Sequence, residues 1–165
     1  MRTAFRLLLL AAGAALGVWL WTVFFPSPQR VILERMTRLA ATVTVGANDS
    51  NLVRAAKAAH LVDFFTTDAE IVLSGTDLPG RTFSGREEIR DAALAGLATV
   101  KTLRVQFLDV TVRLAPDRHS ADVSCTGKVD AGDSKDFGVQ ELHFQFKEVD
   151  GNWLISRVET VKTLS

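Results

Sequence analysis

The spacing of hydrophobic residues changes twice along the chain and divides it into three parts. Nineteen residues in succession, Leu7 to Phe25, carry no charge. From residue 28 to about residue 100, hydrophobic residues recur mostly at the spacing of one helical face, and from Lys101 they alternate with polar residues. A helix repeats every 3.6 residues and a strand every two. This order therefore predicts an apolar segment, then helices, then a sheet.

The middle part predicts two helices before its first strand. Ser27 is expected to cap the first helix, and Pro28 suits the first helical position. The second helix is expected over about residues 52–65. Its polar side is narrow and consists essentially of Arg54 and Lys57. Most of its circumference is therefore expected to be buried.

A short strand and a third helix follow. Residues 69–73 (AEIVL) suit a strand, and residues 74–80 (SGTDLPG) are rich in turn formers. Ser84 and Glu87 have the spacing of a capping box, which marks a helix start. The helix that they begin is expected to bury one face, which carries Ile89, Ala93 and Leu97.

The rest of the chain predicts a meander of four long strands. The first, residues 101–114, changes the phase of its alternation near Leu108 and Asp109, which is typical of a β-bulge. Asp150–Gly151 predicts the last hairpin turn. Bulges bend strands, so the sheet is expected to curl around the helices. The predicted fold class is α+β, with about three helices packed in a strongly curved, mostly antiparallel sheet that forms a cone.

Three stretches in this order resemble the nuclear transport factor 2-like superfamily, which includes ketosteroid isomerases and polyketide-cyclase-like proteins. They are FFTTDAEIVL (residues 64–73), FSGREEIRDAAL (83–94) and DGNWLISRVET (150–160), and the resemblance extends over residues 28–164. The resemblance implies the cone fold. It does not imply one activity, because a single fold carries many unrelated functions.

The isomerase chemistry of that superfamily does not transfer to this chain. The resemblance implies a catalytic aspartate near the end of the first strand, and Leu73 occupies that position. It also implies a tyrosine in the oxyanion hole, and the chain contains no tyrosine. At least two of the three catalytic groups, the aspartate and the tyrosine, are therefore missing.

The apolar run at the N-terminus predicts a membrane anchor over residues 1–26, followed by the cone domain over residues 27–165. As a helix, nineteen residues reach roughly 28 Å, about the thickness of a bilayer core. The alternative is a cleaved signal peptide, whose apolar region is usually shorter and followed by small residues. Here the run ends in bulky side chains: Trp19, Trp21, Phe24 and Phe25.

Two further expectations depend on this anchor. Arg2 and Arg6 precede the run and favour a domain on the periplasmic or extracytoplasmic side of an inner or plasma membrane. The arginines that follow the run favour the alternative, a cytoplasmic domain. Gly13 and Gly17 form a GxxxG pattern that lets two membrane helices approach closely, so a homodimer is expected.

Charge and composition argue against several classes of function. The chain has 19 Lys and Arg, of which Arg2 and Arg6 precede residue 27, and 19 Asp and Glu, so residues 27–165 carry a net charge of −2. Nucleic-acid binding is therefore not expected. Three histidines and Cys125 lack metal-ligand spacing, and no glycine-rich loop precedes a helix, so neither a metal nor another cofactor is expected.

One pair of side chains on the second helix is a candidate for acid–base chemistry. A helical projection places Asp63 among hydrophobic residues, with His60 at the border of that arc. Burial there would raise the pKa of Asp63, as a general acid or base requires. The alternative is structural, with Asp63 bonded to the neighbouring turn.

The ligand-pocket candidates are this pair and four aromatic side chains: His60, Asp63, Phe64, Phe107, Phe144 and Trp153. Three functions remain open. The preferred one is a non-catalytic domain that binds a small apolar ligand or an envelope protein. The second is a small lyase, isomerase or hydrolase that uses Asp63. The third is a structural subunit whose aromatic residues fill the cone.

Overall fold

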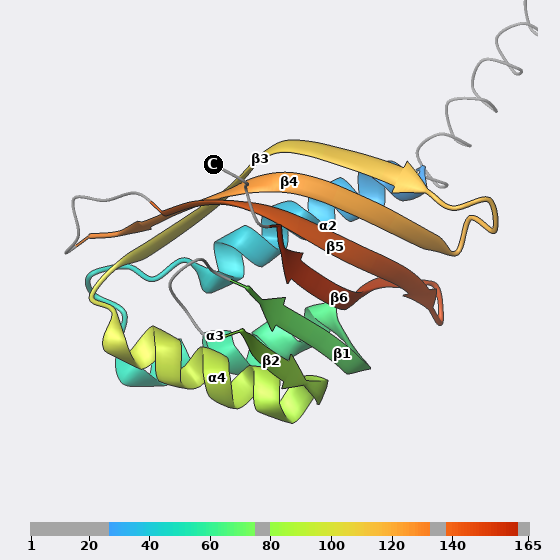
Figure 1. Ribbon diagram of the computed structural model, residues 1–165. Helices are drawn as coiled ribbons and strands as arrows, with labels where there is room; N and C mark the ends of the chain where they lie inside the picture. The colour runs from blue at the N-terminus through green and yellow to red at the C-terminus, as the bar shows by residue number, and fades with distance from the viewer. Residues whose placement is uncertain (1–26, 75–79, 133–137, 162–165) are drawn as a thin grey trace, which may run out of the picture.

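Two helices and a single turn of 3₁₀-helix begin the part of the chain that the computed structural model describes, which comprises residues 27–74, 80–132 and 138–161. Helix α2 spans Pro28–Val43, α3 spans Asn51–Leu61, and the 3₁₀ turn η1 spans Val62–Phe64. Figure 1 shows α2 along the concave side of a curved sheet, with α3 and a later helix, α4, beneath its open side.

Helix α2 begins where the sequence predicts, with Pro28 at its first position. Ser27 occupies the N-cap position, but its side chain makes no capping hydrogen bond, so that part of the prediction was wrong. Ile32, Met36 and Leu39 lie one helical turn apart and are buried against the sheet.

Helix α3 is shorter and much less buried than its pattern predicts. It ends at Leu61, and only Ala58 and Leu61 are buried. Leu52, on the side expected to face the core, is 81% exposed. Arg54 and Lys57 instead turn inward, where they donate hydrogen bonds to backbone carbonyl groups. The prediction failed because it assigned these two long cations to solvent.

A short ribbon of two strands leads to the third helix. Strand β1 (Phe65–Leu73) pairs in antiparallel fashion with β2 (Arg81–Ser84), which the sequence analysis did not identify as a strand, and α4 follows over Gly85–Thr99. Glu88, not Glu87, accepts the hydrogen bond from the Ser84 backbone N–H group. Ser84 occupies the N-cap position as predicted, but its side chain makes no capping hydrogen bond, and Gly85 at the first position of α4 has φ +79°.

Four long strands complete a six-stranded sheet. They are β3 (Leu103–Leu114), β4 (Ser120–Ala131), β5 (Gly138–Val149) and β6 (Asn152–Thr160). The order across the sheet is β2-β1-β6-β5-β4-β3, and all neighbours are antiparallel except β1 and β6, which are parallel. This arrangement confirms the predicted α+β fold with a curved sheet and three helices (Figure 1).

Two local predictions in these strands are confirmed. The register of β3 against β4 shifts between Leu108 and Thr111, and Asp109 has φ +53°. Asp150 and Gly151 form the β5–β6 turn, with φ values of +51° and +75°. Positive φ at both central positions matches the right-handed twist of the strands that the turn joins.

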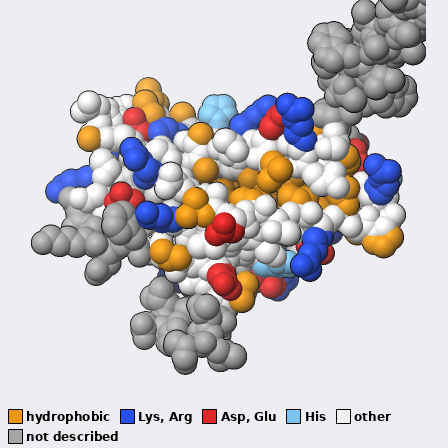
Figure 2. Space-filling model, turned by 90° about the horizontal axis from the view of Figure 1, so that it is seen from above, with side chains coloured by type: hydrophobic (Ala, Val, Ile, Leu, Met, Phe, Trp, Pro, Cys, Tyr) orange, Lys and Arg blue, Asp and Glu red, His pale blue; other side chains and the backbone are white. Residues whose placement is uncertain are grey.

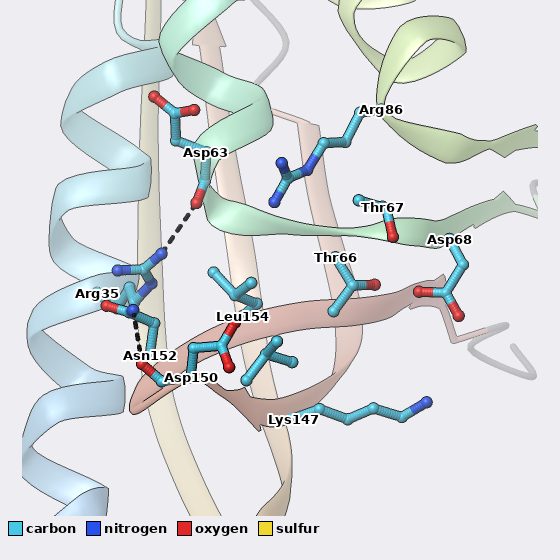
Figure 3. Close-up of a pocket in the computed structure, with 11 residues that line it drawn as sticks. Arg35, Asp63, Thr66, Thr67, Asp68, Arg86, Lys147, Asp150, Asn152 and Leu154 are labelled. Atoms are coloured by element: carbon cyan, nitrogen blue, oxygen red, sulfur yellow. Dashed lines mark hydrogen bonds between the residues drawn. The ribbon is translucent and has the colours of Figure 1, made fainter.

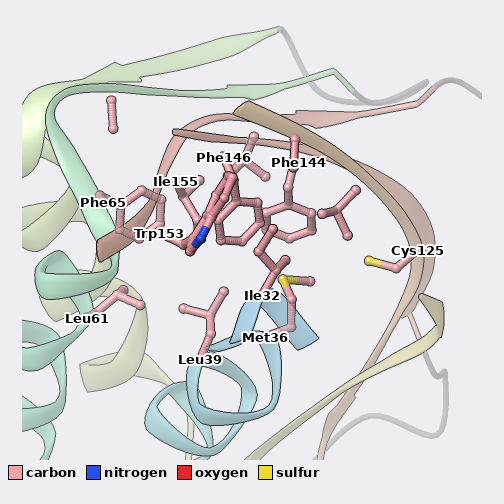
Figure 4. Packing of buried hydrophobic residues seen from close by; sticks show 14 of the residues in the cluster. Ile32, Met36, Leu39, Leu61, Phe65, Cys125, Phe144, Phe146, Trp153 and Ile155 are labelled. Carbon is pink, nitrogen blue, oxygen red and sulfur yellow. The ribbon is translucent and has the colours of Figure 1, made fainter. Parts of the chain in front are cut away.

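The core lies between α2 and the concave face of the sheet (Figure 4). Phe144, Phe146 and Trp153 are 3%, 1% and 4% exposed, respectively. These aromatic side chains fill the space inside the curved sheet. Glu141 and Gln145 lie on the opposite, outer face and are exposed, so the hydrophobic face of β5 is the one that lines the cone.

A hydrophobic seam runs along the top of the molecule, where α2 lies beside β3. Figure 2 shows hydrophobic side chains gathered in this region, bordered by charged ones. Partly buried residues of both elements pack against the core there, among them Val31, Val110, Val112 and Leu114. At the far end of the seam, Val45 and Leu103 exchange two backbone hydrogen bonds, which hold the end of α2 against the start of β3.

Among the described residues, no helix is both long and apolar enough to cross a membrane. The predicted anchor, residues 1–26 with Gly13 and Gly17, lies outside the described residues.

Candidate functional site

A polar pocket of about 640 Å³ opens at the corner where the chain passes from α3 into β1 (Figure 3). Its walls come from α2, η1, the start of β1, the start of α4 and the β5–β6 hairpin. The volume lies within the usual range for small-molecule sites, roughly 300–1,000 Å³.

Two arginines from different helices form the inner wall of this pocket. Arg35 of α2 donates from Nη2 to the backbone oxygen of Asp63 at 2.9 Å. Arg86 of α4 donates from Nε and Nη2 to the backbone oxygen of Phe65, at 2.9 and 2.6 Å. The two guanidinium groups thus fasten the α3–β1 corner. Arg35 also lies over the ring of Phe64, 5.4 Å from its centroid.

Two buried polar atoms of the pocket residues have no hydrogen-bond partner. They are Arg35 Nε and the hydroxyl oxygen of Thr66, which is 6% exposed as a residue. Burial is the main cause that lowers the pKa of Arg35, and Arg38 lowers it further, whereas the Asp63 carboxylate raises it. The pKa of Asp68 is lowered chiefly by the nearby Thr66 hydroxyl, although the two side chains do not reach hydrogen-bonding geometry. Buried polar atoms without partners are rare in folded proteins.

The other charges of the pocket lie on its rim. Asp63, Asp68, Asp150 and Lys147 are all exposed, whereas Arg35 and Arg86 are partly buried. Among the described residues, neither of these arginines forms an ion pair with a carboxylate within 4.0 Å. The interior of the pocket is therefore cationic and its rim mostly acidic.

Asp63 and His60 do not have the surroundings that the sequence analysis expected. Their side chains are 71% and 77% exposed, and His60 Nδ1 lies 3.6 Å from Asp63 Oδ2. Asp63 contributes to the polar pocket, but it is not desolvated, because the neighbouring arc of α3 faces solvent. The expected burial of this carboxyl group was wrong.

The four aromatic candidates belong to the core or its edge. Phe144 and Trp153 are buried, and Phe107 packs edge-to-face on Phe144 with 5.6 Å between ring centroids. Phe64 is partly buried and lies beside Arg35. All four contribute to the hydrophobic cluster inside the cone, so their side chains are already in contact with protein.

A second, hydrophobic groove of about 420 Å³ lies where the ends of α2 and α3 meet α4 and the start of β3. Its lining is almost entirely apolar and includes Val43, Leu61, Leu97 and Leu103. A Cβ atom added to Gly96 would meet no other atom within 4 Å. Ala93 of α4 packs against both hydrophobic clusters and also lines the groove.

Within the part of the chain that the structure describes, the cysteine and the other two histidines form no cluster that suggests a catalytic or metal site. Cys125 is buried in the core, and this burial raises the pKa of its thiol to about 11. His119 Nδ1 lies 2.8 Å from Glu148 Oε2, and His143 Nε2 lies 3.9 Å from Asp122 Oδ1. Within the described ranges, no three His, Cys, Asp or Glu side chains are grouped so that they could hold a metal ion.

Both pockets include residues that the sequence analysis did not select. Arg35 and Arg86 look like ordinary exposed arginines of amphipathic helices, and Thr66 belongs to a Thr-Thr pair at a strand start. Gly96 interrupts an alanine-rich helix, and this was the one available signal for a gap in the packing.

Known structures share this fold at low sequence identity. A proposed aromatic ring hydroxylase from Novosphingobium aromaticivorans is 17% identical, with a TM-score of 0.64 over 82% of this chain and 88% of that one. A proposed scytalone dehydratase from the same organism is 17% identical, with a TM-score of 0.59 over 82% and 84%. An NTF2-like protein of unknown function from Pseudomonas putida KT2440 is 12% identical, with a TM-score of 0.62 over 81% and 85%.

A protein-family model identifies the family to which this chain belongs. None of the curated proteins matches the chain. The model of the SnoaL-like domain matches residues 44–159, from the end of α2 to the end of β6. Because this match spans well over half of the chain and agrees with the cone fold, the protein belongs to the SnoaL-like domain family, with an NTF2-like, cystatin-like fold.

Proposed function

We propose that this protein is a non-catalytic binding domain of the SnoaL-like family that takes a small apolar ligand in the groove beside Gly96. The observation that carries the proposal is the groove itself. Its lining offers almost no polar group to a ligand, and its volume of about 420 Å³ suits a small molecule. An apolar ligand there would gain roughly 25 cal/mol for each Å² of apolar surface removed from water.

The proposal includes a membrane anchor over residues 1–26 that holds the cone domain at the envelope. It is supported by the uncharged run from Leu7 to Phe25 and by the aromatic side chains at its end. Arg2 and Arg6 support an extracytoplasmic domain, and a cytoplasmic domain is the alternative. Gly13 and Gly17 support a homodimer through the anchor. A bilayer concentrates apolar molecules, which fits an apolar groove.

The competing function is a small enzyme that uses Asp63 as acid or base. One observation favours it, because Asp63 lies on the polar pocket together with Arg35 and Arg86. The Asp63 side chain is 71% exposed, however. A carboxylic acid that transfers protons near neutral pH generally needs burial or neighbouring charges to adapt it to that task. The proposed enzymes among the similar structures support the shared fold alone, since they are 17% identical to this chain.

The test uses the neutral fluorescent probe N-phenyl-1-naphthylamine with residues 27–165, which are first checked for a single cooperative unfolding transition. We expect fluorescence to rise on binding to the unmodified domain. Gly96→Leu adds a large side chain to the lining of the groove and is expected to weaken binding by about tenfold or more. Ala98→Leu, on the exposed side of the same helix, is the matched control and is expected to bind normally. Equal binding by all three proteins would contradict the proposal.

A further inference from the structure

The polar pocket presents two positive charges that form no ion pair within 4.0 Å with a carboxylate of the described residues. Arg35 and Arg86 use part of their hydrogen-bonding capacity on the backbone oxygens of Asp63 and Phe65. A guanidinium group has five N–H donors, so both side chains keep donors in reserve. Within the described part of the chain, neither arginine has an ion pair. Partly buried charges of this kind are costly unless a counter-charge accompanies them.

The hydroxyl group of Thr66 adds a second, independent feature. Thr66 is 94% buried, lines the same pocket and has no hydrogen-bond partner for its oxygen. A hydroxyl group left in this state costs free energy that a bound acceptor would recover. Arg35 Nε is unpartnered as well, and it is a donor only. Arg35 Nε can only donate, so the partner that it lacks is an acceptor, and the Thr66 hydroxyl can donate to an acceptor in the pocket as well.

The position of the acidic groups favours an anion over a cation. Figure 3 shows the carboxylate of Asp63 turned away from Arg35, while the backbone oxygen of the same residue faces it. Asp68 and Asp150 are exposed at the rim. A cation would therefore meet guanidinium groups inside the pocket, whereas an anion would meet donors.

The pocket also has an apolar wall. Leu154 of β6 and Val149, the last residue of β5, both line the pocket. A bare inorganic anion would leave these side chains uncovered in a pocket of about 640 Å³. A carboxylate with a small apolar group attached would use both surfaces, because arginine pairs well with planar carboxylates.

We propose that this pocket is a second binding site, separate from the apolar groove, for a small organic carboxylate. The carboxylate lies against Arg35 and Arg86 and accepts a hydrogen bond from Thr66, and the apolar part covers Leu154 and Val149. The site does not depend on the proposed function, because it shares no lining residue with the groove beside Gly96.

The test uses benzoate as the probe and the full chain in an uncharged detergent, at constant ionic strength maintained with chloride. Benzyl alcohol, which has the same ring but no charge, is the matched control ligand. We expect benzoate to raise the unfolding temperature, read from tryptophan fluorescence, and to titrate with millimolar affinity. Benzyl alcohol is expected to give at least about tenfold weaker binding, because it lacks the charge that the arginines require.

Two substitutions separate ligand binding from stability. Thr66→Val removes the unpartnered hydroxyl, so we expect a higher unfolding temperature without ligand and a smaller rise with benzoate. Lys147→Gln removes an exposed cation at the rim and is expected to weaken benzoate binding several-fold without loss of folding. Arg30→Gln removes an exposed arginine of α2 that does not line the pocket and is expected to bind benzoate normally.

Thr66→Val is expected to raise the unfolding temperature of the free protein but to reduce the further rise caused by benzoate. This combination distinguishes a ligand site from a packing defect. Benzoate and benzyl alcohol binding equally would overturn the proposal, and so would an unchanged benzoate response in Thr66→Val. Loss of naphthylamine binding in Gly96→Leu with normal benzoate binding would leave both proposals standing. Normal naphthylamine binding in Gly96→Leu would reject only the apolar groove.

Discussion

Arg54 is an example of one polar side chain that joins two helices. From α3 it donates to the backbone oxygens of Leu97 at 2.7 Å and of Val100, both at the end of α4. It also donates to the oxygens of Asp49 and Lys101, each at 3.2 Å. The last carbonyl groups of a helix have no partner within it, and they carry partial negative charge. Arg54 supplies both donors and positive charge at that end.

Replacing Arg54 by methionine is therefore expected to destabilise the domain by about 2–4 kcal/mol, because several carbonyl groups lose their donors while the apolar stem is kept. Urea unfolding measures the change. Arg54→Lys is expected to restore only part of the loss, since an ammonium group cannot reach the same set of oxygens. Arg90→Met, on the exposed face of α4, is the control and should change stability by less than about 0.5 kcal/mol. A cost for Arg54→Met no larger than this control would refute the role.

At the scale of elements, local signals predicted the structure where the cause is local. The bulge near Asp109 and the turn at Asp150–Gly151 follow from the phase of alternation and from turn chemistry, and both are present. Strand β2 has only the four residues 81–84 and depends on pairing with β1, so its own sequence carried little signal.

The candidate site could be predicted less well from the sequence, because its residues are brought together from distant segments. Arg35 and Arg86 come from helices that are far apart in the sequence, and the carbonyl groups that orient them belong to a third segment. A helical projection shows which side of α3 is apolar, but it does not show that Arg54 and Lys57 find carbonyl groups inside the protein. Those partners are set by tertiary packing, and for that reason the exposed arc of α3, together with Asp63 of η1, was assigned to the interior.

The β5–β6 turn provides a test at this scale. Gly151 has φ +75°, and a Cβ atom there would meet nothing within 4 Å. The cost of Gly151→Ala is therefore conformational alone, and we expect a loss of about 1–2 kcal/mol in the free energy of unfolding. Gly138→Ala is the control, because its backbone is not in the left-handed region and its Cβ would make ordinary contacts. Equal effects of the two substitutions in urea unfolding would show that the backbone conformation at Gly151 is not the cause.

For the whole molecule, three aspartates link folding to pH. The pKa of Asp49 is lowered chiefly by a hydrogen bond from Lys57, that of Asp68 by the Thr66 hydroxyl, and that of Asp117 by the backbone N–H of His119. A carboxyl group whose folded pKa is depressed stabilises the fold at pH values above its unfolded pKa. That contribution is lost as pH falls through the folded pKa, because the unfolded chain then binds more protons.

We therefore expect the free energy of unfolding to be nearly constant between pH 7 and about 5 and to fall steadily below about pH 4, where free aspartates titrate. Urea titrations at a series of pH values measure this dependence. Asp49→Asn is expected to lower stability at pH 7 and to make the decline at low pH shallower. A decline with the same slope in Asp49→Asn and in the unmodified protein would show that Asp49 does not contribute.

The parallel pairing of β1 with β6 has a consequence for how the chain folds as the ribosome makes it. Arg157 of β6 donates a hydrogen bond from Nη1 to Oε2 of Glu70 in β1 at 2.6 Å, although 87 positions separate the two residues in the sequence. Until β6 has been synthesised, β1 has only the four-residue β2 as a partner, and an isolated two-stranded ribbon is barely stable in water. Contacts over such long separations also slow folding, because the loop between them must close first. The hydrophobic residues of β1 therefore lack their partner strand until most of the domain has been made, and we expect chaperones to act on this part of the nascent chain.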